Sequence, residues 1–419
     1  MKGCPKMTRE ELIIICEKAR SAAFCLTDAS LRFKILESMA DMLENNTNDI
    51  VLANELDIQR ARENGISESM IDRLMLNDTR IKAVADAVRA VNVLPDPLRC
   101  DEVIERPNGL IIKKQRVPMG VIGMIYEARP NVTVDAAALA LKSGNAIILR
   151  GGKEALSTNF AIVKVIKSAL LACGVSEDAV YLFTDTSHES AEKLMKLRGH
   201  LDLLIPRGGK RLINTVVENS SVPVIETGAG NCHIYIEKTA DPEMAINVLY
   251  NAKTSRVSVC NAAESLLIDE EIAPALLPRI KASLDEKSVE LRGCPKTLAI
   301  LNHIKAATNE DFYTEYNDYI LSIKVVSDYK EAVQHINTHN TKHSEAIIST
   351  DEAAIDYFME HTDAAALYVN ASTRFTDGGE FGLGAEIGIS TQKLHARGPF
   401  ALEALTTTQY RVYGNGQVR

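Results

Sequence analysis

The first part of the chain has the hydrophobic pattern of amphipathic helices. Over residues 8–95, apolar positions recur at the spacing that places them on one face of a helix, most clearly in 31–43 and 81–93. Strand signals are few here, and Pro95 and Pro97 end the region. We therefore expect residues 1–101 to form a helical part of the first domain.

From Gly120 onward, short apolar runs alternate with amphipathic helical stretches. The first series has expected strands at 121–126, 146–149, 180–183, 201–205 and 224–225, with helices such as 132–142 and 157–173. The second has expected strands near 233–236, 265–268, 323–326, 346–348 and 366–369, with helices at 242–252, 273–285, 329–339 and 351–361. Short apolar strands separated by helices are typical of a doubly wound parallel sheet, so the predicted class is α/β.

Two further stretches read as extended chain outside these series. Residues 110–117, within the segment 102–117, have the pattern of a strand, and so does 405–413 near the end of the chain. Both favour an arm over a core element.

The composition narrows the class of protein. The 419 residues are 46% hydrophobic and 25% charged, which is enough for two or three domains with real cores. A net charge of −9 without a basic tail argues against nucleic-acid binding. The eight cysteines are scattered without a C-x-x-C pair, which argues against a disulfide framework and favours a reducing cytosol. No run suggests a signal peptide or approaches the ~20 apolar residues of a membrane span.

Two copies of Arg-Gly-Gly-Lys, at 150–153 and 207–210, each follow a predicted strand and precede a predicted helix. Ligands bind at the carboxyl ends of strands in open α/β sheets, and glycines and helix N-termini accommodate phosphates there. The basic residues suit the 2′-phosphate of NADP. Alternatively, the glycines only make turns and the basic residues are solvated, but the repetition favours phosphate binding. The near match to G-x-G-x-x-G at 228–233 reads as a turn.

Cys260 lies in a polar stretch, 251–265, between a helical run and an apolar strand. A loop there would hold the thiol in the open. Lys253 and Arg256 are close in sequence and would lower the pKa of the thiol, and only the thiolate is a good nucleophile. The alternative is an inert core or surface thiol.

Two polar residues follow predicted strands. Asn131, after Pro130 at the start of a helix, would donate to a developing oxyanion or simply cap the helix. Glu226, between a strand and a glycine turn, would be a general base or a solvated carboxylate. For both residues, the local pattern by itself favours the simpler alternative.

Three histidines, His335, His339 and His343, have helical spacing that suggests a metal site. A helix that ends near Asn340 would break their common face, and no carboxylates have a matching spacing. We expect no metal.

Together, the loop cysteine, the asparagine, the glutamate and a late Phe-Gly at 381–382 resemble the aldehyde dehydrogenase superfamily. The segments that carry the resemblance cover nearly the whole chain: 117–131, 206–209, 225–233, Arg256 with 260–264, and 381–399. One departure is Asn340, where the family usually has glycine or serine; the change is conservative in turn chemistry.

The resemblance implies a Rossmann-type cofactor domain, an α/β catalytic domain and a β oligomerisation arm. The expected ranges are 1–101 and 118–230 for NADP binding, 231–370 for catalysis, 371–400 for a return to the cofactor domain, and 102–117 with 401–419 for the arm.

The resemblance also implies roles for single residues. Cys260 would be the nucleophile, and Asn131 with the backbone amide of Cys260 would form the oxyanion hole. Glu226 matches the glutamate that activates water in aldehyde-oxidising relatives, and Glu315 matches a carboxylate that holds the nicotinamide ribose. The cofactor-binding positions would be Arg150, Lys153, Gly208, Gly209, Glu315 and Phe381.

The implied reaction is NADPH-dependent reduction of L-glutamyl 5-phosphate to L-glutamate 5-semialdehyde and phosphate through a cysteine thioacyl intermediate, the second step of proline biosynthesis from glutamate. A cytoplasmic homo-oligomer is implied, with glutamate 5-kinase as a candidate partner and no nucleic acid or membrane. One alternative is a hydrolytic NAD(P)-dependent semialdehyde dehydrogenase, and another is a non-catalytic nucleotide-binding protein on the same scaffold. Glu226 is a puzzle because a base beside a thioester would promote hydrolysis.

Overall fold

The computed structural model describes residues 7–127 and 129–419; Met1–Lys6, which include Cys4, and Ala128 lie outside the described residues. The chain divides into two compact units. Unit 1 comprises Met1–Thr227, Gly382–Gly388 and Phe400–Arg419, and unit 2 comprises Gly228–Phe381 and Ile389–Pro399.

The core of unit 1 is a parallel sheet. In the described part of the chain it has four strands in the order β5-β4-β3-β6, with the bounds β3 (Val121–Tyr126), β4 (Ala146–Arg150), β5 (Val180–Leu182) and β6 (Leu203–Arg207). Every residue of β3 is buried. A strand covered on both faces reads as a continuous apolar run, which is why its bounds were predictable.

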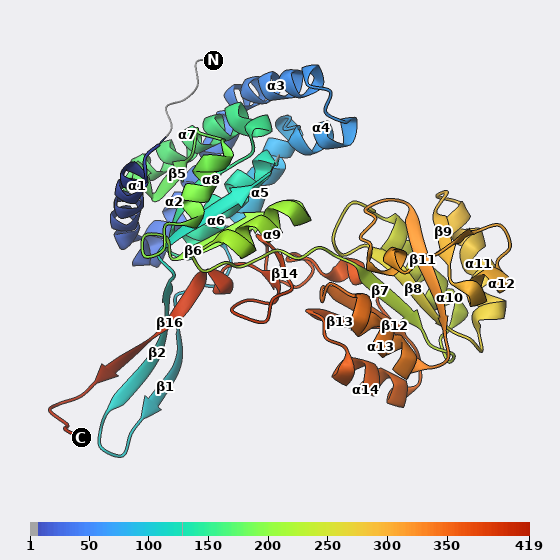
Figure 1. Cartoon of the computed structure of the whole chain (residues 1–419). Helices are drawn as coiled ribbons and strands as arrows, with labels where there is room; N and C mark the ends of the chain where they lie inside the picture. Colours follow the sequence, from blue (N-terminus) through green and yellow to red (C-terminus); the bar gives the residue numbers. More distant parts are fainter. Residues whose placement is uncertain (1–6, 128) are drawn as a thin grey trace. The chain divides into compact units, whose positions relative to one another are not determined.

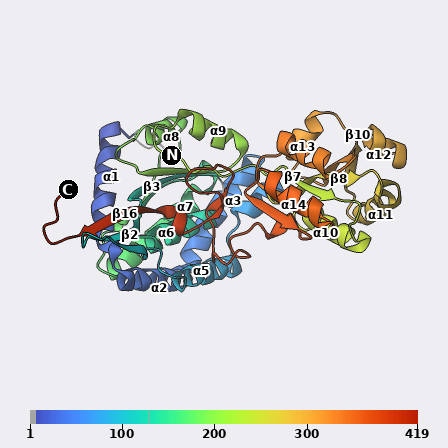
Figure 2. The same cartoon turned by 90° about the horizontal axis from the view of Figure 1, so that it is seen from below.

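Helices cover both faces of this sheet (Figure 2). On one face α6 and α7 pack against the strands and against α2, α3 and α5, while α1 contacts the sheet separately. The helices are α1 (Arg9–Ala22), α2 (Ala29–Asn45), α3 (Thr47–Glu63), α4 (Glu68–Leu74), α5 (Asp78–Asn92), α6 (Pro130–Lys142), α7 (Leu156–Ala172), α8 (His188–Met195) and α9 (Lys210–Asn219). Short 3-10 turns are η1 (Ala23–Thr27), η2 (Lys153–Ala155) and η3 (Glu177–Ala179).

One helical stretch, Lys153–Ala172, is long and apolar enough to cross a membrane by length and composition. The sequence pattern had not singled it out. Half of its window is buried inside the structure, and α7 within it packs against α2, α3, α6 and β5. These contacts are those of a core helix in an α/β unit.

The two stretches predicted as an arm pair with each other. β2 (Ile111–Pro118) lies between β1 (Cys100–Glu105) and β16 (Thr406–Tyr413), and both pairings are antiparallel. The three strands form the long ribbon of unit 1 labelled in Figure 1. Its apolar side chains Val103, Tyr410 and Val412 are exposed.

Unit 2 contains a larger parallel sheet. In the described residues it has seven strands in the order β10-β9-β11-β8-β7-β12-β13. The bounds are β7 (Cys232–Ile236), β8 (Ala263–Asp269), β9 (Glu290–Gly293), β10 (Lys305–Ala306), β11 (Ile320–Val326), β12 (Ser344–Ile348) and β13 (Ala366–Val369). A separate two-stranded sheet is formed by β14 (Gly388–Ser390) and β15 (Gly398–Phe400).

Side chains of the central strands alternate between two cores, one on each face of the sheet. Ile234 and Leu266 belong to one core with Leu249 and Leu277, whereas Tyr235 and Leu267 belong to the other with Ile336 and Phe358. The covering helices are α10 (Pro242–Thr254), α11 (Ala273–Asp285), α12 (Pro295–Ile300), α13 (Tyr329–His339) and α14 (Glu352–His361). Short turns are η4 (Glu310–Tyr313), η5 (Thr373–Phe375) and η6 (Glu403–Leu405), the last in unit 1. The predicted α/β class is confirmed.

The chain returns to unit 1 over a shorter range than the predicted 371–400. Residues 371–381 and 389–399 belong to unit 2, and only 382–388 and the chain from 400 belong to unit 1. Residues 371–381 stay with unit 2 because hydrogen bonds hold them there: Thr373 Oγ1 donates to Asn261 O, and Thr376 Oγ1 pairs with Ser344 Oγ.

Candidate active site

In unit 1, the predicted cofactor and catalytic residues gather at one edge of the parallel sheet. Asn131 follows β3, the first Arg-Gly-Gly-Lys turn follows β4, and the second follows β6. Because these strands are parallel, their carboxyl ends lie at the same edge. The sheet therefore brings together residues that lie as far as 82 positions apart in the sequence.

The first turn is held in place by Arg150. Its Nη2 donates to Thr186 O at 2.6 Å and to Ser187 O at 3.0 Å, at the start of α8. Burial lowers the pKa of the guanidinium. Arg150 thus anchors the turn, and Lys153 is the exposed cation of this turn. Gly151 is required because a Cβ would lie 2.4 Å from Asn159 Nδ2.

The second turn presents backbone N–H groups at the N-terminus of α9. Gly209 N donates to Glu127 Oε2 at 2.9 Å, and a Cβ on Gly208 would lie 2.7 Å from the same carboxylate. An anion therefore already interacts with this helix end, as the helix dipole favours. Sequence reasoning missed Glu127, although its position directly after β3 marks it as a residue of this edge.

Two features of these turns would suit the phosphates of a dinucleotide. Glycines whose Cβ would collide with neighbours let the backbone come close, and the exposed Lys153 and Lys210 supply positive charge. The assignments of Arg150, Lys153, Gly208 and Gly209 to cofactor binding stay predictions, and the position of Arg150 favours a supporting role over direct contact.

Asn131 lies in the first turn of α6 and is tied to a carboxyl group. Its Nδ2 donates to Asp135 Oδ2 at 3.2 Å. Burial raises the pKa of Asp135 to about 6, against the hydrogen bond from Asn131 and the charge of Arg207, which lower it. An amide has two N–H groups, so this bond orients Asn131 and leaves its second N–H for another acceptor. Sequence reasoning did not single out Asp135.

The raised pKa of Asp135 predicts a pH-dependent stability. A carboxyl whose pKa is raised on folding stabilises the folded state below its ordinary value near 4, and that contribution is lost as the pH rises through about 6. Asp135→Asn removes the buried charge, so we expect the variant to be more stable than the wild type at pH 8 by about 1–3 kcal/mol. Thermal unfolding from pH 4 to 8 checks this. A difference that does not shrink towards pH 4 would contradict the assignment.

Glu226 lies beside the end of β6. Ile225 N donates to Leu204 O at 3.1 Å, and Thr227 Oγ1 donates to Pro206 O at 3.2 Å. This segment forms only an isolated bridge, Leu204 to Val224, instead of the predicted strand. The carboxylate is half-buried at the same edge of the sheet as the turns.

In unit 2, the predicted residues Cys260 and Glu315 lie at the amino-terminal edge of the sheet, together with Gly230 and His343. Gly230 precedes β7, Cys260 precedes β8, Glu315 precedes β11, and His343 precedes β12. The strands are parallel, so this is the amino-terminal edge of the sheet. The general rule for open α/β sheets places ligands at the carboxyl ends of the strands, so the rule by itself would not point to the edge where these residues lie.

Cys260 is half-buried in the turn between α10 and β8, and its backbone is tightly packed. A Cβ on Gly230 would lie 1.4 Å from Cys260 O, so only glycine fits there. Cys232 Sγ donates to the same oxygen at 3.2 Å. Burial raises the pKa of Cys232 well above its ordinary value, which keeps this second thiol protonated. Sequence reasoning identified the nucleophile candidate but missed both residues that hold it.

Glu315 also supports this loop. Its Oε1 accepts a hydrogen bond from Gly230 N at 2.7 Å. The carboxylate predicted to hold the nicotinamide ribose therefore lies in unit 2, where it holds Gly230, the residue packed against the Cys260 backbone. Phe381, the other predicted cofactor residue of this unit, is 45% exposed at the end of its first segment.

Lys253 does not have the role that its place in the sequence suggested. It is fully buried and donates to Glu264 Oε2 at 2.6 Å. Burial raises the pKa of Glu264 to about 7, with the Lys253 charge opposing the shift, and burial lowers the pKa of Lys253. This pair neutralises itself, so Lys253 adds little positive charge for a neighbouring thiol.

The three histidines separate as the helix ends. His335 and His339 stack on α13 at 3.9 Å between ring centroids, whereas His343 lies beyond the Asn340 cap and contacts Ser344 Oγ at 2.8 Å. Within residues 7–127 and 129–419, no cluster of three ligating side chains has a geometry that would hold a metal ion.

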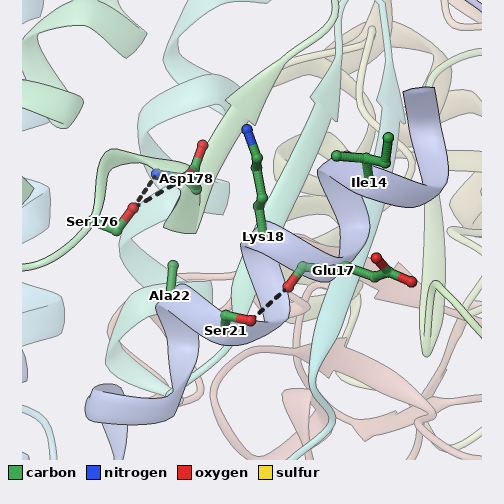
Figure 3. A pocket seen from close by; sticks show the side chains of 7 residues that line it. All are labelled: Ile14, Glu17, Lys18, Ser21, Ala22, Ser176 and Asp178. Carbon is green, nitrogen blue, oxygen red and sulfur yellow. Dashed lines mark hydrogen bonds between the residues drawn. The ribbon is translucent and has the colours of Figure 1, made fainter.

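A surface hollow of about 380 Å³ in unit 1 lies between α1 and η3 (Figure 3). Its hydroxyl groups already have partners: Ser21 Oγ donates to Glu17 O, and Ser176 Oγ pairs with Asp178. Its lining includes none of the predicted site residues. The hollow is therefore not the candidate active site.

Comparisons with known proteins agree over nearly the whole chain. Residues 1–297 match the aldehyde dehydrogenase family. A gamma-glutamyl phosphate reductase from Clostridium perfringens strain 13 is 54% identical over 412 residues, which are 98% of this chain and 99% of that protein. The crystal structure of gamma-glutamyl phosphate reductase from Thermotoga maritima has a TM-score of 0.96 and 47% identity, covering 98% of this chain and 100% of that one. An engineered glycolyl-CoA reductase with bound NADP+ shares the fold, with a TM-score of 0.68, 18% identity and 95% coverage of both chains.

Proposed function

Because the chain belongs to the aldehyde dehydrogenase family, and within it to the gamma-glutamyl phosphate reductases, we propose that it reduces L-glutamyl 5-phosphate to L-glutamate 5-semialdehyde and phosphate with NADPH. The chain is an oxidoreductase of proline biosynthesis that acts on a small molecule with a nicotinamide cofactor. The observation that supports this substrate is the near-complete match, at 54% identity, to an enzyme named for that substrate.

Cys260 is the proposed nucleophile. Its thiolate attacks the acyl phosphate carbonyl, a C–S bond forms, and the C–O bond to phosphate breaks, which leaves a thioacyl enzyme. The close approach of Gly230 and the hydrogen bond from Cys232 support this role, because they hold the backbone of Cys260 in one position. A fixed nucleophile needs little reorganisation to reach the carbonyl.

Asn131 and the backbone amide of Cys260 are the proposed donors to the oxyanion. Removal of one such donor typically costs about 3–4 kcal/mol of transition-state stabilisation. The bond from Asn131 to Asp135 supports the proposal, because it fixes the amide and directs one of its N–H groups. When bound, the dinucleotide supplies the hydride that turns the thioester into the aldehyde.

The thioester has to be protected from water until it is reduced. Glu226 is therefore proposed to orient groups or transfer a proton, and not to activate water as in aldehyde-oxidising relatives. If Glu226→Gln slowed only hydrolysis of the thioester and left reduction unchanged, this assignment would be wrong.

The cofactor specificity and the assembly belong to the same proposal. Lys153 and Lys210, exposed at the two glycine turns, supply charge for the 2′-phosphate that distinguishes NADPH from NADH. The exposed apolar side chains of the β1-β2-β16 arm support a homo-oligomer. We place the protein in the cytoplasm, with glutamate 5-kinase as its candidate partner.

The test is oxidation of glutamate semialdehyde by NADP+, with and without phosphate. The reverse of the proposed reaction consumes phosphate, so formation of NADPH should depend on phosphate and should not respond to sulfate at the same ionic strength. Turnover that is independent of phosphate would identify a hydrolytic semialdehyde dehydrogenase instead. No turnover under any condition, from a protein that binds NADP+, would favour a non-catalytic nucleotide-binding protein.

A further inference from the structure

The short turn η5 in unit 2 is hydrogen-bonded to the residue that follows Cys260. Asn261 Nδ2 donates to Arg374 O at 3.2 Å and to Thr376 O at 3.0 Å, and Thr373 Oγ1 donates to Asn261 O at 2.8 Å. Asn261 itself is buried. These bonds fix η5 against the nucleophile loop, although Asn261 and Arg374 are 113 residues apart in sequence.

The side chain of Arg374 spans this loop. Its Nε donates to Ser255 Oγ at 3.0 Å, and its Nη1 contacts Asn261 Oδ1. Ser255 lies at the end of α10 and Asn261 lies directly after Cys260, so one guanidinium contacts both ends of the segment that carries the thiol. Arg374 is half-buried, which limits its motion and keeps its charge at this place.

Arg374 and Arg256 leave positive charge beside Cys260. Burial lowers the pKa of Arg374 most, and the nearby Arg256 guanidinium lowers it further. A Cys260 thiolate opposes both effects and raises the pKa. In the described residues, neither arginine is in a salt bridge with a carboxylate, and the negative charge of Asp377 acts on Arg374 without such a contact. The third cation of the segment, Lys253, is neutralised by Glu264. The guanidinium groups of Arg256 and Arg374 repel each other, and an anion bound between them would relieve that repulsion.

We propose that Arg374 and Arg256 form the subsite that binds the phosphoryl group of the acyl phosphate and, in the reverse direction, inorganic phosphate. This inference rests on the proposed function, since it assigns residues to the leaving group of that reaction. A planar guanidinium matches two phosphate oxygens at once, and a doubly charged phosphate uses both cations. In the reverse direction, a phosphate oxygen held there attacks the thioester carbonyl, the C–S bond breaks, and the thiolate leaves.

The competing role for the same charges is to stabilise the Cys260 thiolate only. The two roles predict different measurements. A phosphate subsite changes the KM for phosphate and spares the KM for glutamate semialdehyde. Stabilisation of the thiolate alone shifts the pH profile of Cys260 alkylation and leaves the KM for phosphate unchanged.

The experiment measures oxidation of glutamate semialdehyde by NADP+ at varied phosphate for Arg256→Gln, Arg374→Lys and the control Arg279→Gln. Arg256 is exposed, so its substitution should not disturb folding. Arg374→Lys keeps the charge but loses the planar fork. The control removes an exposed arginine of unit 2 that pairs with Glu243. We expect the KM for phosphate to rise about 10- to 100-fold in the first two variants, with the other KM values unchanged.

A second measurement needs no turnover. Bound phosphate should slow the alkylation of Cys260 by iodoacetamide, followed by mass spectrometry, and the phosphate concentration for half-protection should rise about 10-fold in both subsite variants. The inference is overturned if, in both subsite variants, the KM for phosphate and the phosphate concentration for half-protection stay within about twofold of the wild-type values while the wild type requires phosphate. If the wild type itself turns over without phosphate, the proposed function fails first, so the two failures are distinguishable.

Discussion

Changing Cys260 to serine is expected to lower kcat by about 10⁴-fold or more in both directions of the reaction. A thiol becomes a strong nucleophile by its own ionisation, whereas a serine hydroxyl does not ionise near neutral pH and would need a general base to activate it. The measurement is NADPH formation from glutamate semialdehyde, NADP+ and phosphate. Binding of NADP+ should be unchanged, because the two glycine turns proposed for its phosphates belong to unit 1 and the substitution leaves Glu315 and Phe381 in place.

The matched control is Cys294→Ser in the same unit. Cys294 is also half-buried, but its Sγ contacts Thr297 Oγ1 at 3.3 Å before α12. We expect this variant to keep wild-type kcat. If Cys260→Ser retained substantial turnover, the covalent mechanism would be wrong; if both variants lost activity equally, the loss would reflect folding and not chemistry.

The second large effect is expected from Gly230→Ala. The new Cβ would lie 1.4 Å from Cys260 O and 2.7 Å from Cys260 Cα, so one of the two backbones has to move. A displacement of the nucleophile by about 1 Å can cost on the order of 100-fold in rate, and we expect a loss of at least that size in kcat/KM. Overpacking of this kind also costs about 1–3 kcal/mol of stability, which thermal unfolding would report.

The control for this substitution is Gly379→Ala, also in unit 2. Its Cβ would meet only Asp377 Oδ1, the end of a flexible side chain, at 3.1 Å, and its backbone has no positive φ. We expect near wild-type kcat/KM from this variant. Gly230→Ala with full activity and an unchanged rate of Cys260 alkylation would show that the close approach does not position the nucleophile.

The secondary structure was predictable to a large extent because it depends on local patterns. The runs at 121–126 and 366–369 became β3 and β13 with the predicted bounds. The run of β3 is apolar because this strand is buried throughout, whereas β13 is a half-buried strand at the edge of its sheet and was recognised from its apolar run alone. The short elements β9, β10 and α12 were missed. They are too short, or too polar, to have a period of their own, and contacts with neighbouring elements support them.

The candidate site was predictable only for residues whose chemistry shows in their own neighbourhood. Cys260 and the two Arg-Gly-Gly-Lys turns could be singled out because a thiol in a polar loop and glycines after strands have recognisable chemistry. Lys253 shows the limit of this reasoning. It is seven positions before Cys260, yet its side chain turns into the core to pair with Glu264.

The sequence by itself determined the α/β class, the family and the identity of the nucleophile candidate, because periodicity and motif residues are local properties. Only the tertiary structure decided what surrounds that nucleophile. Pairing of β7 with β8 brings Gly230 and Cys232 against Cys260, and η5 brings Arg374 across the same loop. The reason is that strand order and turn packing are set by contacts between distant segments, and no pattern within either segment encodes the partner that it meets.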